Sequence, residues 1–504
     1  MRKSSIKRGT VLGLALFCAT LGTGNAQTMQ DYEELRAQLF DVHAGLSEES
    51  ATLQHPSRVD GLLADLIDLN AEPSFEAEPP RASTGAADIQ LIDLRLALLH
   101  LSLAAGSNDQ LSIVRAQSAS TPQAIVVNGG QVNLDDLRTW VSAQSDPKSL
   151  LNGDTLHVPL VVFQDGRFDM ASSDTLELST KDGAFIANLG VLVMDGATIS
   201  ATSDTNETAE QFVPFVATAG TGQAQISNSV FERLGFGDTA LYSGVSVINR
   251  GLYAPIGQSY LTDTVLRDVQ GATFYGGSSP IINSNVFVGE NAGGLVLRST
   301  DNAVVSSNVL VGEATEAALK FMDGATNSTV RHNIIFSASG PGIFVTEGSH
   351  ETTITDNLIW RSGSGISVIH SDCIDLTGNV LVDNQRKGIE LRTSRNSRIV
   401  ANQMLGNHSS GLFIGAQPSG TTTWLNDNLF IGNRVGLSSA SADHLVLNRN
   451  DFQNQFPRFL DGDLVAQTSR IVTNLNGTAA IELQAGGIEL FNITHLACLT
   501  QLEG

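Results

Sequence analysis

Residues 365–384, GISVIHSDCIDLTGNVLVDN, are followed closely by residues 388–407, GIELRTSRNSRIVANQMLGN, which have the same skeleton. In each segment a Gly opens a short apolar-polar alternation, and a second alternation is centred on Asn379 or Asn402, 23 residues apart. Alternate side chains of a strand face opposite sides. We therefore expect Ile366 and Val368 to point inward and Ser367 to point outward.

The same unit recurs along more than 200 residues, in steps of 22 to 26 residues from Asp263 onward. Its anchor positions are Asn228, Asp263, Asn285, Asn308, Asn333, Asn357, Asn379, Asn402, Asn428 and Asn450. The units lack the Leu skeleton of leucine-rich repeats and the long amphipathic runs of helical repeats, so each is predicted to be one coil of a parallel β-helix. Because a single coil cannot bury its inner face, repetition is required. An Asn at a turn tolerates a left-handed backbone and can bond to the coils on either side, so the Asn series is predicted to be structural.

The first 26 residues are predicted to be an export signal. Basic residues precede the apolar run VLGLALFCATLG, and Gly24 and Ala26 form the small pair that a signal peptidase accepts, which predicts cleavage after Ala26. That run is too short for a permanent anchor, and no later segment offers about 18 uninterrupted apolar residues. The mature chain is therefore expected to be exported and not inserted in a membrane.

The composition excludes some partners. Asp and Glu outnumber Lys and Arg by 52 to 29, for a net charge of −23, which argues against nucleic acid and anionic membrane surfaces. After cleavage only Cys373 and Cys498 remain, too few for a disulfide scaffold, and whether they pair is left open. The many Gly residues and few aromatic residues suit an extended β architecture.

We expect an all-β solenoid behind an acidic, largely helical N-terminal region. The predicted segments are a signal peptide (1–26), an acidic helical region with a Pro-rich linker at 71–87 (27–105), a β-rich entry segment and cap (106–165), the β-helix (166–456) and a C-terminal cap (457–504). Within the second segment, DIQLIDLRLALLHLSLAAG fits neither period well, and helix is favoured. This region is either a docking module for partner proteins or a solvated appendage.

Ordered local matches between Pro122 and Phe456 carry a family resemblance. They are PQAIVVNGGQVNLDDL, GAFIANLGVLVMDGATIS, FVPFVATAG, YSGVSVINRG and GATFYGGSSPIINSN. In this order and spacing the chain resembles the periplasmic mannuronan C5-epimerases of alginate biosynthesis. The resemblance implies a right-handed parallel β-helix, periplasmic residence, and a polyuronate lying along a groove on one face. It also implies a reaction that needs no metal or organic cofactor.

The catalytic motif of that family is missing. The implied reaction abstracts the C5 proton beside a carboxylate and returns a proton from the other face. It requires a base, an acid, and a cation or hydrogen-bond donors that stabilise the negative charge moving onto the carboxylate. The family's Asp-Pro-His-Asp motif falls here on Leu295, Val296, Leu297 and Arg298, and a family Arg falls near Asp323. Two functions stay open: a protein that binds or guides an acidic polysaccharide without turnover, and an epimerase or lyase whose chemistry has moved to another coil.

The outward positions of the first strand of each coil supply the candidate binding residues. Arg298, Lys320 and Arg392 would bind saccharide carboxylates, while Phe344 and Phe413 would stack on sugar faces. The alternative is that these charged residues are ordinary solvent-exposed side chains of a long sheet and bind no saccharide. The expected partners are an anionic polysaccharide and, through the N-terminal region, other periplasmic export proteins.

If the protein is an enzyme, the predicted catalytic residues are His370, Glu347 and Glu390. His370 is the group at the corner after this strand that is suited to proton transfer near neutral pH, one coil from Glu347 and beside Glu390. The two carboxylates would also satisfy the loose spacing for glycoside hydrolysis. No carboxylate cluster of the kind that holds calcium is found on this face, so no metal is predicted.

Overall fold

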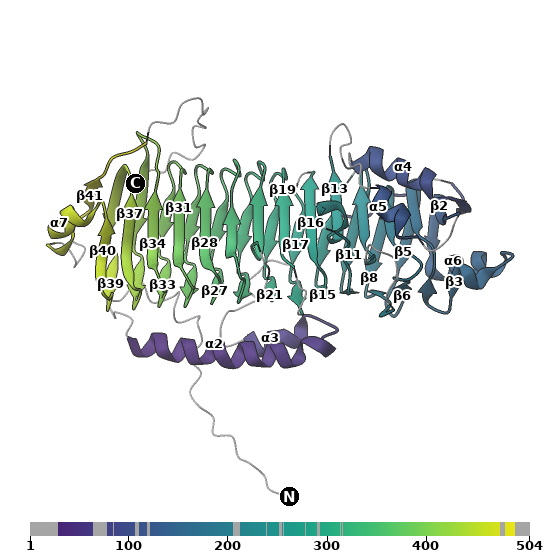
Figure 1. Cartoon of the computed structure of the whole chain (residues 1–504), viewed down its shortest axis with the longest axis horizontal. Helices are drawn as coiled ribbons and strands as arrows, with labels where there is room; N and C mark the ends of the chain where they lie inside the picture. Colours follow the sequence, from purple (N-terminus) through teal and green to yellow (C-terminus); the bar gives the residue numbers. More distant parts are fainter. Residues whose placement is uncertain are drawn as a thin grey trace, which may run out of the picture.

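The computed structural model describes residues 29–63, 78–83, 85–105, 110–117, 121–204, 212–237, 239–250, 255, 257–277, 279–289, 293–312, 314, 316–473 and 479–488. The predicted signal peptide, part of the predicted linker and Cys498 lie outside these residues, so the cleavage site stays a prediction and the cysteine pairing stays open. The described chain forms a long solenoid of stacked parallel strands flanked by helices (Figure 1). The expected β-helix is confirmed.

Three sheets form the walls of the solenoid, and most coils add one strand to each; their strands pair in parallel, except that β3 and β4 pair antiparallel. Sheet 1 contains β7 Ile186–Asn188, β10 Val216–Ala219, β13 Gly244–Asn249, β16 Gly271–Gly276, β19 Leu295–Arg298, β22 Leu319–Met322, β25 Pro341–Val345, β28 Ser364–Ile369, β31 Lys387–Arg392, β34 Ser410–Gly415, β37 Val435–Ala440 and β40 Arg458–Gly462. Sheet 2 contains β8 Val191–Asp195, β11 Gln223–Ser227, β14 Tyr260–Thr262, β17 Ile281–Asn283, β20 Val304–Ser306, β23 Thr329–Arg331, β26 Thr353–Thr355, β29 Asp375–Thr377, β32 Arg398–Val400, β35 Thr422–Asn426 and β38 His444–Asn448. Sheet 3 contains β3 Leu151–Asn152, β4 Thr155–Leu156, β6 Thr175–Leu178, β9 Thr198–Ala201, β12 Val230–Glu232, β15 Val265–Arg267, β18 Val286–Val288, β21 Val309–Val311, β24 Ile334–Phe336, β27 Leu358–Trp360, β30 Val380–Val382, β33 Gln403–Leu405, β36 Leu429–Ile431 and β39 Asp451–Gln453.

Two long strands, β2 Gln123–Asn133 and β5 Leu160–Met170, start the stack. Strand β5 pairs in parallel with β2, β7 and β8, so it joins sheets 1 and 2. Parallel pairing therefore begins before Gly166, and β40 carries it past Phe456.

The interior is built from the inward positions of the alternation. Ile366, Val368, Ile389 and Leu391 are fully buried, as expected, and belong to one continuous apolar core that runs along the rod. Each coil stacks the same residue class on its neighbour, which is why the period of the sequence sets the period of the structure.

The N-terminal region wraps around the outside of this rod. Helices α2 Met29–Glu49 and α3 Ser57–Leu63, with the 3-10 turn η1 Ser50–Thr52 between them, lie along sheet 3 (Figure 1). Apolar side chains of α2, including Leu35 and Leu39, pack on outward apolar residues of that sheet, such as Val380. The helical prediction for this segment is confirmed.

The segment DIQLIDLRLALLHLSLAAG, which fits neither the helical nor the strand period well, contains a strand followed by a helix. Residues Asp88–Asp93 form β1, which pairs antiparallel with β2, and helix α4 Leu94–Ala105 follows. The favoured interpretation of helix throughout is therefore wrong for β1, because pairing with β2 overrides the local pattern. With α5 Gln110–Arg115, α4 packs on the outer face of the first strands of sheet 1.

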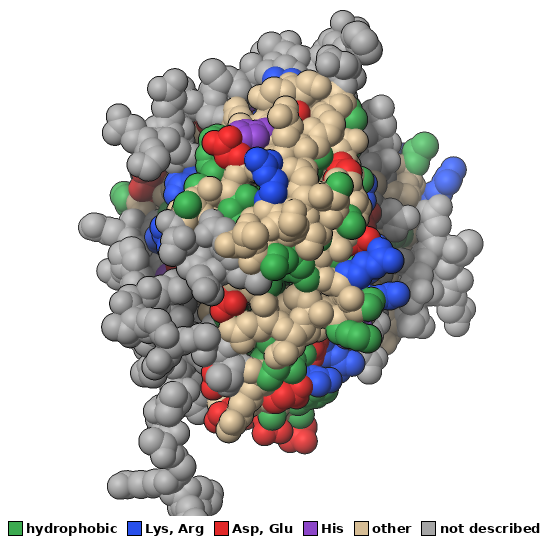
Figure 2. Space-filling model, turned by 90° about the vertical axis from the view of Figure 1, so that its left-hand side faces the viewer, with side chains coloured by type: hydrophobic (Ala, Val, Ile, Leu, Met, Phe, Trp, Pro, Cys, Tyr) green, Lys and Arg blue, Asp and Glu red, His purple; other side chains and the backbone are tan. Residues whose placement is uncertain are grey.

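Both ends of the interior are closed by side chains of neighbouring elements. Helix α6 Leu134–Ser142, which has a capping box between Asn133 and Asp136, buries Leu137 in the interior core. At the other end are η5 Val465–Gln467, α7 Thr468–Val472 and β41 Ile481–Gln484, the last antiparallel to β38. Ile471 and Leu483 are buried there, and Figure 2 shows that the described hydrophobic side chains on this end form small separate groups.

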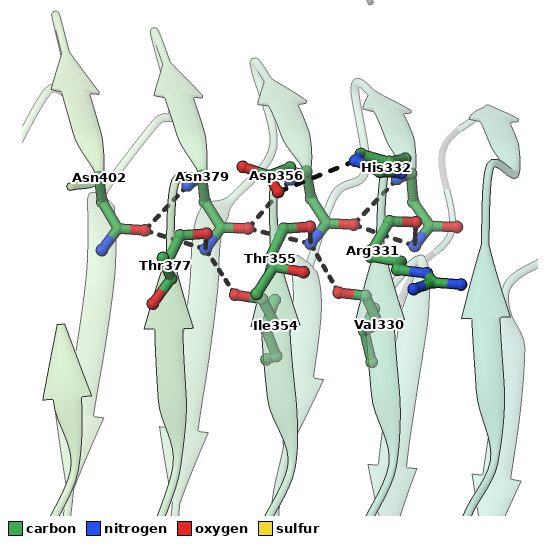
Figure 3. Close-up of polar contacts among 11 residues, drawn as sticks. Val330, Arg331, His332, Ile354, Thr355, Asp356, Thr377, Asn379 and Asn402 are labelled. Carbon is green, nitrogen blue, oxygen red and sulfur yellow. Dashed lines mark hydrogen bonds and ion pairs between the residues drawn. The ribbon is translucent and has the colours of Figure 1, made fainter. Parts of the chain in front are cut away.

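A ladder of asparagine side chains runs through the corner between sheets 2 and 3 (Figure 3). Its members are Asn285, Asn308, Asn333, Asn357, Asn379, Asn402, Asn428 and Asn450. Each Nδ2 donates to the Oδ1 of the next member at 2.8–3.1 Å, and that Oδ1 also accepts the backbone N–H of the previous member. The predicted structural role is confirmed for these eight residues.

Two predicted anchors, Asn228 and Asp263, stand one residue away from the ladder. Ser229 and Thr264 occupy the ladder positions, where Thr264 N–H donates to Oδ1 of Asn285 at 3.1 Å. Asn228 and Asp263 instead occupy the preceding corner position, with φ of 49°. The residue before each ladder member makes the left-handed turn, so the expectation that the ladder Asn itself does so is wrong.

A second ladder, which the sequence analysis missed, lies between sheets 3 and 1. Asn384 donates to Asn407, and Asn407 donates to Asn433, each at 2.9 Å. These residues end the visible repeat unit, so the recurring Asn at that position was the available signal.

Candidate functional site

The predicted outward residues of sheet 1 form two rows along the rod. Row A comprises Val296, Lys320, Phe344, Ser367, Glu390 and Phe413, each in register with the next. Row B lies two residues further along each strand and comprises Arg298, Met322, Thr346, Ile369, Arg392 and Gly415. The predicted alignment of these positions agrees with the strand register.

Helix α4 divides sheet 1 into a covered part and an uncovered part. In the first coils the outward residues are apolar, for example Ala187, Ala217 and Ile248, and they are buried beneath α4 and α5. From β16 onward the same rows carry Tyr275 and then charged residues. We call the outer surface of β16 to β37 the open face.

Arg298 lies at the start of the open face and is held on two sides. Its Nε pairs with the Asp323 carboxylate, and its guanidinium lies 5.0 Å from the centre of the Tyr275 ring. Arg250 lies at the same distance from that ring. Since Arg298 remains about one third exposed, its Nη groups can still donate outward.

Asp323 and Glu347 sit on successive coils at the corner after sheet 1, both with a left-handed backbone of φ 52°. A hydrogen bond between the two carboxyl groups lowers the pKa of Asp323 and raises the pKa of Glu347. Lys320 and Arg298 favour the ionised form of both groups. When the pair holds a single proton, these shifts place that proton on Glu347, which then donates to ionised Asp323.

A compact charged group surrounds Glu390 further along the face. Lys387 donates to Glu390 at 2.6 Å, and Arg392 donates to the same oxygen through Nε. Burial alone would raise the pKa of Glu390, but these two hydrogen bonds outweigh it and hold the pKa below its usual value. The cations also lie 4.4 and 4.5 Å from the Phe413 ring centre, and that ring folds over Gly415.

The predicted catalytic residues are placed in neighbouring coils but bond to different partners. His370 is exposed at the same left-handed corner as Glu347, with φ of 55°. The carboxyl of Glu347 bonds to Asp323, whereas Glu390 is held by Lys387 and Arg392. Phe344 is partly buried in row A and lies next to Lys320. The roles of all these residues stay predictions.

Sequence reasoning missed three contributors to this face. From the sequence, Asp323 was recognised only as an acidic residue near the position of a family Arg. Its location at a corner beside Glu347 nevertheless follows from the repeat. Tyr275 is in register with Arg298, so its outward direction follows from the repeat, whereas Lys387 begins β31, where the alternation gives no direction for a side chain. Their contacts with Glu390 and Arg298 depend on side-chain rotamers that periodicity does not determine.

Metal ligands are not grouped in the described part of the chain, where no set of three or more His, Cys, Asp and Glu side chains is arranged to hold an ion. None of the described helices is long and apolar enough to cross a bilayer.

The fold defines the chain as a right-handed parallel β-helix protein, since residues 214–381 match a right-handed β-helix region. Residues 345–468 match a family described as periplasmic copper-binding protein (NosD). The described residues do not fit a copper site of that kind, because they contain no group of three or more His, Cys, Asp or Glu side chains that could hold an ion.

The chain is also distantly homologous to mannuronan C5-epimerases. Those of Pseudomonas putida and Pseudomonas aeruginosa are 23% identical over 324 residues and 24% identical over 365 residues. The matches cover 61% and 68% of this chain, and 62% and 65% of the two relatives. Less than two thirds of either relative is spanned, so their activity is not carried over by similarity alone.

Solved structures show the same fold. The crystal structure of the periplasmic alginate epimerase AlgG aligns with a TM-score of 0.59 at 18% identity, covering 77% of this chain and 98% of that one. A double mutant of the same protein aligns with the same TM-score at 20% identity.

Proposed function

We propose that the protein is exported to the periplasm and binds an anionic, alginate-like polysaccharide along the open face. The observation that carries this proposal is the change in the outward rows of sheet 1. They are apolar beneath α4, whereas from β16 onward they include the cations Arg298, Lys320 and Arg392 and the aromatic residues Tyr275, Phe344 and Phe413. Relatives named mannuronan C5-epimerase and periplasmic alginate epimerase support the class of polymer and the compartment.

The arginines of this face suit polymer carboxylates. Arg298 and Arg392 are held through Nε by Asp323 and Glu390, which orients each guanidinium and leaves its Nη edge outward. Arginine binds carboxylates through two parallel N–H donors, and such charge-assisted bonds are strong. Because the whole chain carries a net charge of −23, attraction for a polyanion must come from these local cations.

A polysaccharide-modifying enzyme is the second candidate, and the Asp323–Glu347 pair favours it. A carboxyl group with a raised pKa beside an ionised partner can deliver or accept a proton. The pair lies at the edge of the open face, one coil from His370. An epimerase or lyase with relocated residues would use this corner, with His370, Glu347 and Glu390 as its predicted groups.

The N-terminal region is proposed to contact other periplasmic export proteins. The apolar side of α2 packs against sheet 3, and Phe40 is the large apolar residue that this helix leaves exposed among its described side chains. Helix α4, in contrast, exposes Leu96, Leu99 and Leu103 away from the solenoid.

Proton NMR of polymannuronate in deuterated buffer separates the two candidates. With the wild-type protein we expect broadened polymer signals, which report binding, and no loss of the C5 proton signal. Loss of a positioned base costs a factor of about 10² to 10⁴ in rate. The family Arg, which would stabilise the charge on the substrate carboxylate, is also replaced, since its position falls near Asp323. The control is a neutral dextran, whose signals stay sharp.

Incorporation of deuterium at C5 would contradict binding without turnover and favour the enzyme. In that case His370→Ala and Glu347→Gln identify the corner. Abolished exchange in a folded variant places the chemistry there, and unchanged exchange in both removes that corner from the site.

A further inference from the structure

A hollow of about 590 Å³ lies between the second half of α2 and the corner that follows the strands of sheet 3. It is on a different side of the rod from the open face. Helix α2 runs along this corner, with Tyr32 donating to Asp383 at 2.6 Å and Phe40 packing edge-on against Trp360 at 4.9 Å.

The hollow exists because side chains become small along the corner. Successive coils place Asp383, Arg361, Ser337, Gly312 and Gly289 at equivalent positions after their sheet 3 strands. The last two residues have no side chain to fill the space under α2. On the opposite side the hollow is lined by His43 and Ser47 of α2 and by Ser50 of η1.

Arg361 is the charged residue that faces this hollow. Its guanidinium lies 5.2 Å from the Trp360 ring centre and 5.3 Å from that of Phe40, so the aromatic rings fix its orientation. Among the described lining residues none is acidic. Burial, and then the charge of Arg361, lower the pKa of His43, which keeps its imidazole neutral.

The carboxyl groups on the same corner either bond to other residues or lie away from Arg361. Asp383 accepts from Tyr32 and pairs with Arg36 at 2.9 Å. Asp268 lies against Gly289, at the end of the hollow away from Arg361. In a chain with a net charge of −23, a guanidinium that faces a cavity without an acidic side chain among its described lining residues favours an anion as the ligand.

We propose that this hollow binds a small hydroxylated organic anion, of the hexuronate or hexose phosphate class. The anionic group would lie against Arg361, and the sugar hydroxyls would bond to Ser47, Ser50, Ser337 and Gln385. A volume of about 590 Å³ falls within the range of about 300 to 1,000 Å³ that is typical of small-molecule pockets. The site does not depend on polysaccharide binding at sheet 1.

Isothermal titration of the full chain with glucuronate, glucose 6-phosphate, inorganic phosphate and glucose tests the site. We expect glucuronate or glucose 6-phosphate to bind, and the one that does identifies the anionic group. Glucose should give no measurable heat. Arg361→Gln should weaken binding at least tenfold, while the exposed control Arg449→Gln leaves it unchanged.

Ser47→Trp provides a second variant that tests the location independently. Ser47 is exposed on α2 and bonds only to its own helix, at His43 O, so a large side chain there would fill the hollow without disturbing the core. It should abolish binding with unchanged circular dichroism. Binding of neither sugar anion, equal binding of inorganic phosphate, or wild-type affinity in Ser47→Trp would each overturn the proposal.

Discussion

Asn379→Ala is expected to lower the free energy of unfolding by roughly 3 to 5 kcal/mol, because it breaks the asparagine ladder in its middle. Asn379 is fully buried. Its Oδ1 accepts two N–H groups of Asn357, at 2.9 and 3.1 Å, and its Nδ2 donates to Asn402 and Ile354. Alanine leaves these donors and acceptors buried without partners, and each such group costs about 1 to 3 kcal/mol.

Guanidinium unfolding followed by far-ultraviolet circular dichroism measures this loss. The matched control is Asn152→Ala, whose side chain is exposed on β3, and its change should stay within about 0.5 kcal/mol. If Asn379→Ala unfolds at the same denaturant concentration as the control, the ladder does not stabilise the coil stack.

Arg392→Ala is expected to weaken polymannuronate binding by about 1 to 3 kcal/mol, which is roughly 5- to 150-fold in Kd. The arginine is 40% exposed on the open face. Its loss should leave the fold intact, because Lys387 continues to pair with Glu390 at 2.6 Å. Titration calorimetry at fixed salt measures the affinity.

Arg449→Ala is the matched control for this measurement. Arg449 also pairs with a carboxylate, that of Asp427, but lies at the corner between sheets 2 and 3. The control should bind as tightly as the wild type, and equal losses in both variants would mean that the effect comes from net charge rather than from the open face.

The coil architecture could be predicted because its causes are local in the sequence. A 23-residue period with alternating apolar residues sets both the strand direction and the register, so rows A and B follow from counting. The path of α4 could not be predicted in this way. Its covering of sheet 1 depends on β1 pairing with β2, a contact between residues such as Ile92 and Ala124 that lie far apart in sequence.

The charged contacts could be predicted only in part. Counting placed Arg298 and Arg392 on the same face, and the structure agrees. Counting along the sequence could not show that Arg298 bonds to Asp323, or that the carboxyl groups of Glu347 and Asp323 share a hydrogen bond, because such bonds depend on side-chain rotamers. The ladder register was wrong at Asn228 because Ser229 replaces the expected Asn.

Binding of the polymer to the open face is tested by the structure of the protein with a bound mannuronate oligosaccharide. We expect the sugar chain to lie across the outer surface of β19 to β31, with carboxylates within hydrogen-bonding distance of Arg298 and Arg392. An oligosaccharide that lies on sheet 2 instead of sheet 1, or a crystal soaked at high concentration that shows none on sheet 1, would contradict this function.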